Sequence, residues 1–295
     1  MKRLDKKGFA ISTLIYSILI MGILIMGTLY STMAFRKKST QDFTRKVEEN
    51  LIEREIKNYT ICKAATELHT DGDKYYGKIP SGTIEVGDAF DCDVNGNNVF
   101  EKEERFYYLA PENGEEGSTR YVLIYSSNTA LFLTNIVIPV IDKTVAYSSG
   151  VLSDIQAKPA TAYKSLPPAN TWNNTALLAP GTVNITDENR AVKVPNFNYG
   201  DTLTRFPRLT EIMSATKSLA FSNLTNHDSL SAYSFLFENL GTIKGYWFEE
   251  VASSSKTEGW VVNNTSKSIT KVSTGSTEYG TRPVIVVEKE NVYFE

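Results

Sequence analysis

The stretch KKGFAISTLIYSILIMGILIMGTLYSTMAFRKK, residues 6–38, decides the structure of the N-terminal part of the chain. Two lysines precede Gly8, and no charged residue follows until Arg36. A helix over 9–35 is about 40 Å long at about 1.5 Å per residue, and about 20 apolar residues span the core of a bilayer. The stretch therefore predicts a membrane-spanning helix. It is longer than the apolar part of a signal peptide, which has about 7–15 residues.

Basic residues flank this helix on both sides, so the positive-inside rule does not decide its orientation. The residues concerned are Lys2, Arg3, Lys6 and Lys7 before it, and Arg36, Lys37, Lys38, Arg45 and Lys46 after it. The region that follows is polar and rich in Thr and Asn, which favours an extracellular domain. We therefore expect a single-pass membrane protein at the cell surface, with its N-terminus in the cytoplasm.

The helical pattern continues beyond the apolar stretch. Phe43, Val47 and Leu51 recur at a spacing of four, and charged residues occupy the opposite face, as in an amphipathic helix that packs on a domain. We expect this second helical segment over 36–62, continuous with the first. The predicted organisation is a basic leader over 1–8, a membrane helix over 9–35, the amphipathic helix, and a head over 63–295.

The junction Lys6-Lys7-Gly8-Phe9, followed by an unbroken apolar helix, resembles the N-terminus of type IV pilins and pseudopilins. The resemblance covers about the first 60 residues. It implies that a prepilin peptidase cleaves between Gly8 and Phe9, that the new N-terminal Phe9 is methylated, and that residues 9–35 pack against other pilin-like subunits. The family usually has Glu at the fifth mature position, which here is Thr13. A plain membrane anchor, and a signal peptide removed near Ala34, are the alternative interpretations.

The head is predicted to be α+β with a large irregular fraction. Runs of β-branched and aromatic residues predict strands, and one apolar-periodic segment predicts a short helix. The strands are expected at Arg120–Tyr125, Ala130–Val140, Trp260–Val262 and Pro283–Val287, and the helix at Leu209–Ser218. A proline- and asparagine-rich region over 149–202 predicts a long loop.

Parts of the head resemble the formylglycine-generating-enzyme-like branch of C-type-lectin folds, loosely and over about residues 75–290. The resemblance rests on Arg205–Glu211, Tyr246–Phe248, Gly259–Val262 and Tyr279–Ile285. Catalytic members of that group use a pair of cysteines near the C-terminus, whereas this chain has no cysteine after Cys92. The resemblance therefore implies a lectin-like scaffold for binding a glycan or protein, and not an enzyme.

The motif Asp91-Cys92-Asp93-Val94-Asn95-Gly96 places oxygen side chains at alternating positions before a glycine, as in the first half of an EF-hand calcium loop. The predicted ligands are Asp91, Asp93, Asn95, Asn97, Glu101 and Glu103. The twelfth position of this loop, where a bidentate Glu is expected, is Lys102, and Glu101, Glu103 and Glu104 surround it as candidates for a shifted loop. The alternative is an Asn- and Gly-rich hairpin turn that binds no ion.

The remaining composition excludes several classes of function. The net charge is −3 and basic patches with interleaved aromatics are absent from the sequence, which argues against nucleic-acid binding. The two cysteines, Cys62 and Cys92, allow one disulfide or two free thiols. The two histidines exclude a His-rich zinc site. The adjacent Asn226-His227-Asp228-Ser229 is a polar loop in our interpretation, because triads are assembled from distant positions.

These observations support two hypotheses. The first is a pilin-like surface protein that is anchored in the membrane, assembles into or with a filament, and uses its head for adhesion or contact. The second is a monomeric, membrane-tethered extracellular binding protein with a lectin-like head.

Overall fold

The computed structural model describes residues 6–71, 74–126, 166–218, 221–225, 230, 232–238, 244–253, 258–273, 276 and 278–294 of the 295-residue chain. The chain divides into two compact units, Met1–Asn58 and Tyr59–Glu295. The predicted strand Ala130–Val140 and the segment 226–229 lie outside the described residues.

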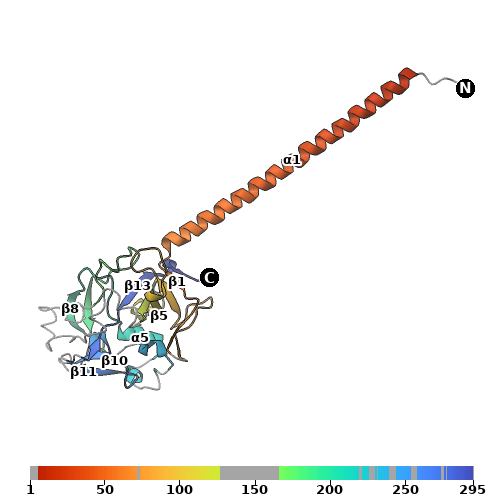
Figure 1. The fold of residues 1–295 in the computed structure, drawn as a ribbon. Coiled ribbons are helices and arrows are strands. Elements are labelled where there is room, and N and C mark those ends of the chain that lie inside the picture. The colour runs from red at the N-terminus through yellow and green to blue at the C-terminus, as the bar shows by residue number, and fades with distance from the viewer. Residues whose placement is uncertain are drawn as a thin grey trace. The chain divides into compact units, whose positions relative to one another are not determined.

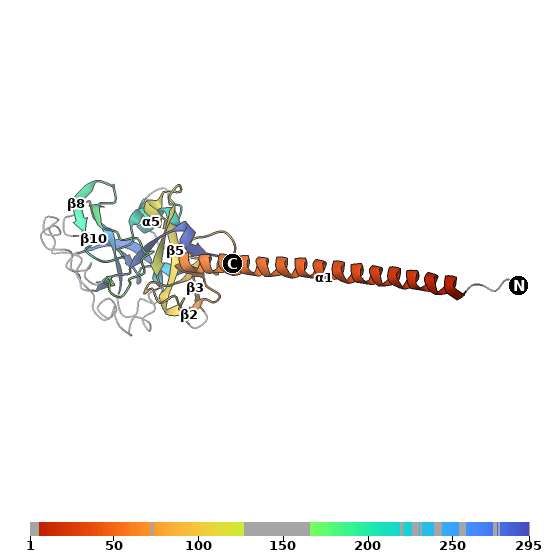
Figure 2. The same ribbon diagram turned by 90° about the horizontal axis from the view of Figure 1, so that it is seen from above.

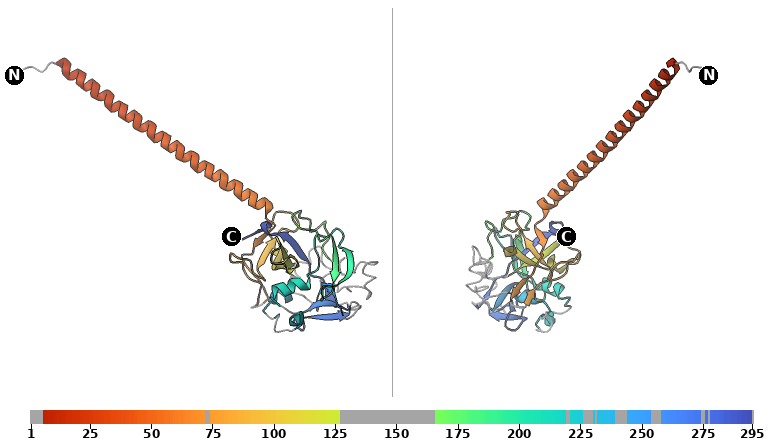
Figure 3. Two further views of the ribbon diagram at one scale, coloured as in Figure 1. Left: turned by 180° about the vertical axis from the view of Figure 1, so that it is seen from behind. Right: turned by 45° about the vertical axis from the view of Figure 1, so that its right-hand side comes forward.

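The first unit consists of helix α1, Lys6–Tyr59, a single helix of 54 residues. Figure 3 shows it as uninterrupted from two directions. It contains no proline, and its Leu, Met, Lys, Arg and Glu residues have high helix propensity. The helix ends before the expected boundary at residue 62, because Ile61 donates its backbone N–H to Asn291 (2.8 Å) and Cys62 begins a strand. Competing sheet pairing therefore sets this helix end.

The head is built on a six-stranded sheet in the order β13-β6-β5-β4-β1-β14, of which Figure 1 labels β13, β5 and β1. Neighbours are antiparallel except β1 and β14, which pair in parallel and bring the two ends of the head together. The strands are β1 Cys62–Ala64, β4 Ala89–Cys92, β5 Arg105–Pro111, β6 Arg120–Tyr125, β13 Val284–Glu288 and β14 Val292–Tyr293.

A second sheet of four strands has the order β11-β10-β9-β12. Its strands are β9 Gly245–Val251, β10 Glu258–Asn263, β11 Ser268–Ser273 and β12 Tyr279–Gly280. Gly245 pairs with both Asn263 and Tyr279, and a Cβ there would lie 1.7 Å from the Val262 carbonyl oxygen. The close approach of these strands therefore requires glycine.

Two hairpins and short helices complete the described head. The hairpins are β2 His69–Asp71 with β3 Lys74–Tyr76, and β7 Thr182–Thr186 with β8 Val192–Asn198. In Figure 2 they lie on opposite sides of the head. The helix α5 spans Leu209–Ala215, and short 3₁₀ segments are η1 Lys102–Glu104, η2 Glu112–Gly114, η4 Phe221–Thr225, η5 Ser234–Phe237 and η6 Lys289–Asn291.

The core lies on both faces of the six-stranded sheet. Along β5, Phe106 packs in one cluster with Trp172 and Ile285, and Tyr107 packs in the other with Ile212 and Phe248. A strand buried on both faces reads as a continuous apolar run, which is why β5, β6 and β13 lack polar alternation. A third cluster gathers around Trp247 and Phe206, between the β7–β8 hairpin and β9.

The prediction of an α+β chain with a long N-terminal helix is confirmed. Strands at Arg120–Tyr125, Trp260–Val262 and Pro283–Val287 and the helix beginning at Leu209 are present, with small boundary changes. The expectation of a continuous loop over 149–202 is wrong in its described part, because β7 and β8 form a hairpin there. Among the described residues β8 pairs with β7 alone, and Pro195 lies at a register shift of that pairing, where a proline is tolerated.

Candidate functional site

Helix α1 carries the candidate membrane segment. Within the described residues, Ser12–Glu49 is one helical stretch long and apolar enough to cross a membrane, a property that an N-terminal signal sequence shares. Its aliphatic side chains are exposed, among them Leu14, Ile18 and Leu24, each more than half accessible. An exposed and uniformly apolar helix is stable in lipid or packed among similar helices.

Several hydroxyl groups in this segment donate to backbone carbonyls of the same helix. Ser17 Oγ donates to the Leu14 carbonyl (2.8 Å) and Thr28 Oγ1 donates to the Ile25 carbonyl (2.9 Å). Such bonds reduce the cost of placing a hydroxyl in an apolar medium. At Gly22 and Gly27 an added Cβ would meet no atom within 4 Å, so the backbone is open to close approach by another helix.

The predicted processing pair lies at the start of α1. Gly8 and Phe9 are both helical, and the helix begins before them at Lys6. Thr13 lies one turn further along the same helix. The peptide bond between Gly8 and Phe9 therefore lies within the first two turns of α1.

Cys62 and Cys92 form a disulfide between neighbouring strands of the head. They face each other in the β1–β4 register, with Cα atoms 4.0 Å apart and an S–S distance of 2.07 Å. Both residues are fully buried. The bond fastens β1, the first strand of the head, to the central sheet.

Among the predicted calcium ligands, Asp91 is engaged elsewhere. Its carboxylate accepts two hydrogen bonds from the fully buried Arg105, at 2.5 Å from Nε and 3.1 Å from Nη2. Asp91 and Arg105 are also cross-strand partners in β4 and β5. Asp91 therefore neutralises a buried guanidinium within the sheet.

Asp93, Asn95 and Asn97 lie together in the turn after β4. The Asp93 carboxylate accepts the backbone N–H groups of Asn97 (2.9 Å) and Asn98 (3.0 Å). Asn95 Oδ1 also accepts the Asn97 N–H (2.9 Å), and Asn97 Oδ1 accepts the Val99 N–H (2.7 Å). Successive side-chain oxygens thus hold the turn closed.

Of the three glutamates that follow this turn, Glu104 is buried, Glu103 is exposed and Glu101 is intermediate. Asn95 Nδ2 donates to Glu104 Oε1 at 2.6 Å. Burial raises the pKa of Glu104 to about 8, and the charges of Asp93 and Glu101 act in the same direction. Among the described residues, no three His, Cys, Asp or Glu side chains converge as a metal site. Any ion here would therefore also need amide and carbonyl oxygens.

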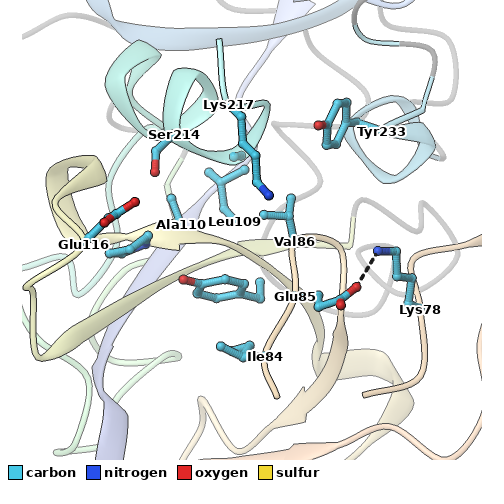
Figure 4. Close-up of a pocket in the computed structure, with 13 residues that line it drawn as sticks. Lys78, Ile84, Glu85, Val86, Leu109, Ala110, Glu116, Ser214, Lys217 and Tyr233 are labelled. Atoms are coloured by element: carbon cyan, nitrogen blue, oxygen red, sulfur yellow. Dashed lines mark hydrogen bonds and ion pairs between the residues drawn. The ribbon is translucent and has the colours of Figure 1, made fainter. Parts of the chain in front are cut away.

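A pocket of about 540 Å³ opens on the head beside α5 (Figure 4). Lys217 extends into it from just beyond the end of α5, and Lys78 forms an ion pair with Glu85 (3.0 Å) at its side. Its lining combines amines, carboxylates and phenol rings from Lys78, Ile84, Glu85, Val86, Tyr108, Leu109, Ala110, Pro111, Glu116, Ser214, Ala215, Lys217 and Tyr233. Such a lining offers hydrogen bonding and ring contact to a polar ligand.

A second, smaller pocket of about 330 Å³ contains a network of buried charges. Arg208 Nε donates to Glu249 Oε1 (2.6 Å), and Tyr199 donates its hydroxyl to Glu249 Oε2 (2.6 Å). Burial alone would lower the pKa of Arg208, but the carboxylates of Glu249 and Glu211 outweigh it and the pKa is raised. Glu250 accepts the Leu209 N–H (2.9 Å) at the start of α5. The network therefore joins α5 to β9.

Glu250 is expected to make the stability of the head depend on pH. Burial, and then the charge of Glu249, raise its pKa to about 8, against hydrogen bonding to Leu209 and the charge of Arg208. The folded protein therefore holds the proton more tightly than the unfolded chain, and stability falls as pH rises from about 5 to 8. Glu250→Gln should reduce this slope by about 1 kcal/mol per pH unit over that range. Denaturation curves at several pH values measure it, and an unchanged slope contradicts the assignment.

His69 meets a serine and a carboxylate, but not in the geometry of a catalytic triad. Its Nδ1 lies 3.0 Å from Ser126 Oγ and 3.2 Å from Glu238 Oε1. A triad uses the two different ring nitrogens for these two contacts, so that the base can pass a proton. Here both contacts fall on one nitrogen, which fits a buried structural hydrogen-bond network.

Comparisons with protein families, with characterised proteins and with solved structures found no match to this chain. The function must therefore be argued from the chain's own residues. Sequence reasoning did not find the pocket residues Lys78, Tyr108, Lys217 and Tyr233, because they come from separate segments and share no motif. The sequence alone also did not distinguish Glu104 from Glu101 and Glu103 as a candidate ligand, because the difference between Glu103 and Glu104 is their burial.

Proposed function

We propose that this chain is a pilin-like structural protein of the cell surface. In this proposal α1 anchors the precursor in the membrane, a prepilin peptidase removes residues 1–8, and residues 9–35 then pack against other pilin-like subunits. The observation that carries it is the length of α1 combined with its uncharged run over 9–35, whose side chains are exposed from Ser12 onward. Its 54 residues extend about 80 Å, whereas a bilayer core is about 30 Å thick. A simple anchor does not require a helix of this length.

The exposed faces of α1 support packing between copies. Aliphatic side chains cover the segment on every side, and Gly22 and Gly27 leave the backbone accessible. Helices in lipid associate through such small-residue positions and through van der Waals contact. Phe43 and Leu51 extend the exposed apolar surface beyond the uncharged segment.

The disulfide supports an extracellular head. Disulfides persist in oxidising compartments and are rare in the cytosol. A buried Cys62–Cys92 bond in the head is consistent with an N-terminus in the cytoplasm and a head outside the membrane.

We assign adhesion or surface contact to the head, with the larger pocket as the contact site. Amines, carboxylates and tyrosine rings line it together, which suits a glycan or a polar protein segment. The second candidate function is a monomeric, membrane-tethered binding protein with the same head. Thr13 favours this alternative, because it supplies no carboxylate to pair with the N-terminal amine of a neighbouring subunit.

Processing at Gly8 is the first experimental test. Protein produced in its own host, or coexpressed with a prepilin peptidase, should begin at Phe9. Gly8→Leu should leave almost all of the protein with residue Met1 at its start, because a side chain then occupies the position before the cleaved bond. Intact mass and N-terminal sequencing measure both outcomes.

Gly22→Leu is the matched control, since it makes the same change in the same helix at a position where a Cβ meets no atom within 4 Å. It should be cleaved like the wild type. An intact Met1 in the wild-type protein would leave the plain anchor as the better description. Cleavage near Ala34 would exclude both anchored forms.

A further inference from the structure

We propose that residues 93–104 form a calcium-binding loop in which Asp93 is the first ligand and Glu104 is the last. An EF-hand loop has twelve residues, with side-chain oxygens at positions 1, 3 and 5, a backbone carbonyl at 7, a ligand or bridging water at 9, and a bidentate Glu at 12. Counted from Asp93, these positions are Asp93, Asn95, Asn97, Val99, Glu101 and Glu104.

The backbone conformation fits this register. Position 6 of such a loop is normally glycine, because the chain turns sharply there. Position 6 is here Asn98, which has a left-handed φ of 61°. Asparagine tolerates this conformation better than most side chains. Gly96, at position 4, is also left-handed (φ 72°), so the backbone permits this register and the side chains decide it.

The side chains at positions 1, 3 and 12 already converge. Asp93 accepts the N–H groups of positions 5 and 6, so its carboxylate lies inside the turn. Asn95 donates to Glu104 Oε1, which fixes the Glu104 carboxylate against the same turn. The two ends of the twelve-residue segment are thus joined through one asparagine.

Glu104 supplies an independent sign of a missing partner. The residue is 8% exposed, and its Oε2 is buried with no hydrogen-bond partner among the described residues. An unsatisfied buried carboxylate oxygen is costly. A calcium ion bound by both oxygens of Glu104 removes that cost, with the Asn95 amide turned so that its oxygen faces the ion.

The neighbouring residues exclude the register that begins at Asp91. In that register the first ligand, Asp91, forms an ion pair with Arg105. The twelfth residue is Lys102, which forms an exposed ion pair with Glu67 and has no carboxylate to offer. Asp93 and Glu104 provide two carboxylates at the turn, Glu101 at position 9 would act through a bridging water, and the asparagines are neutral. This donor set suits an extracellular site with a dissociation constant of about 10⁻⁴–10⁻³ M.

The test uses the full-length protein in detergent, freed of metal with a chelator and then titrated with CaCl₂ or MgCl₂. Above the dissociation constant, every tenfold increase in calcium concentration should raise the melting temperature of the head by about 4 °C. Calorimetric titration measures the affinity directly. Magnesium should give a smaller shift, because it requires a compact octahedral site.

Glu104→Gln should weaken calcium binding by at least about tenfold, since even outer-shell changes cost about 10–100-fold in metal affinity. The variant is expected to fold, because an uncharged amide of the same shape replaces a buried carboxylate, and its melting temperature in chelator checks this. Glu103→Gln is the matched control at an exposed neighbour and should bind calcium like the wild type. Absence of a calcium shift in the wild type, or equal losses in the two variants, would overturn the assignment.

Discussion

Glu211→Gln is expected to lower the free energy of unfolding of the head by about 3–5 kcal/mol, because it leaves a buried guanidinium without its counter-charge. Arg205 and Glu211 are 2% and 0% exposed, and the two side chains form a bidentate ion pair. Arg205 otherwise donates only one described side-chain bond, to the Phe206 carbonyl (2.8 Å). An amide accepts one hydrogen bond from the guanidinium but carries no charge.

The same substitution also weakens a helix cap, because an amide has only one accepting oxygen for Arg205 and for the Arg208 backbone N–H. Glu211 Oε2 accepts the backbone N–H of Arg208 (3.0 Å) at the start of α5, and charged caps are worth about 1 kcal/mol. Arg205 itself exchanges backbone hydrogen bonds with Val284 of β13. Disturbance at this pair should therefore reach both α5 and the central sheet.

Denaturant unfolding monitored by tryptophan fluorescence measures this effect, because the three tryptophans are all buried in the head. Glu85→Gln is the matched control at the exposed ion pair with Lys78, and it should cost at most about 1 kcal/mol. The double variant Arg205→Met, Glu211→Leu should regain much of the loss, since apolar residues often replace a buried pair without cost. Equal losses for Glu211→Gln and Glu85→Gln would show that the buried charge is not decisive.

The elements that sequence reasoning found are those with one dominant signal. The uncharged run after Lys7 predicts a helix without information from the rest of the chain, and this run lies within α1. The apolar runs of β6 and β13 are long enough to identify central strands. At α5 the apolar positions Leu209 and Ile212 face the core and Glu211 bonds back to Arg208, so local pattern and tertiary structure agree.

The elements that it missed depend on contacts between distant segments. Val183, Ile185 and Phe197 alternate with polar residues as strands do, but nearby prolines and asparagines favour a loop, and packing against Trp247 decides the outcome. The pairing of Cys62 with Cys92 needed a Cα separation that only the β1–β4 register supplies. The choice between Asp91 and Asp93 as first ligand needed the position of Arg105, which follows Glu104 in the chain but faces β4.

Reduction of the Cys62–Cys92 bond is expected to destabilise the head by about 3.5 kcal/mol, because the bond closes a loop with a sequence separation of 30. The lost stability should be greatest at β1 and β4, the two strands that the disulfide joins. β1 has three residues and pairs with β4 and β14, so without the bond a short strand must hold the beginning and end of the head together.

Unfolding curves of the wild type with and without dithiothreitol measure this effect, with tryptophan fluorescence as the signal. The double variant Cys62→Ala, Cys92→Ala controls for other actions of the reductant. It should unfold like the reduced wild type and should not respond to dithiothreitol. Both cysteines are fully buried, so reduction is expected to require transient opening of β1. The rate of reduction should therefore rise with denaturant at concentrations below the unfolding transition. If reduction leaves the curve unchanged, the β1–β4 and β1–β14 pairings alone hold the strand, and the disulfide loses its structural role.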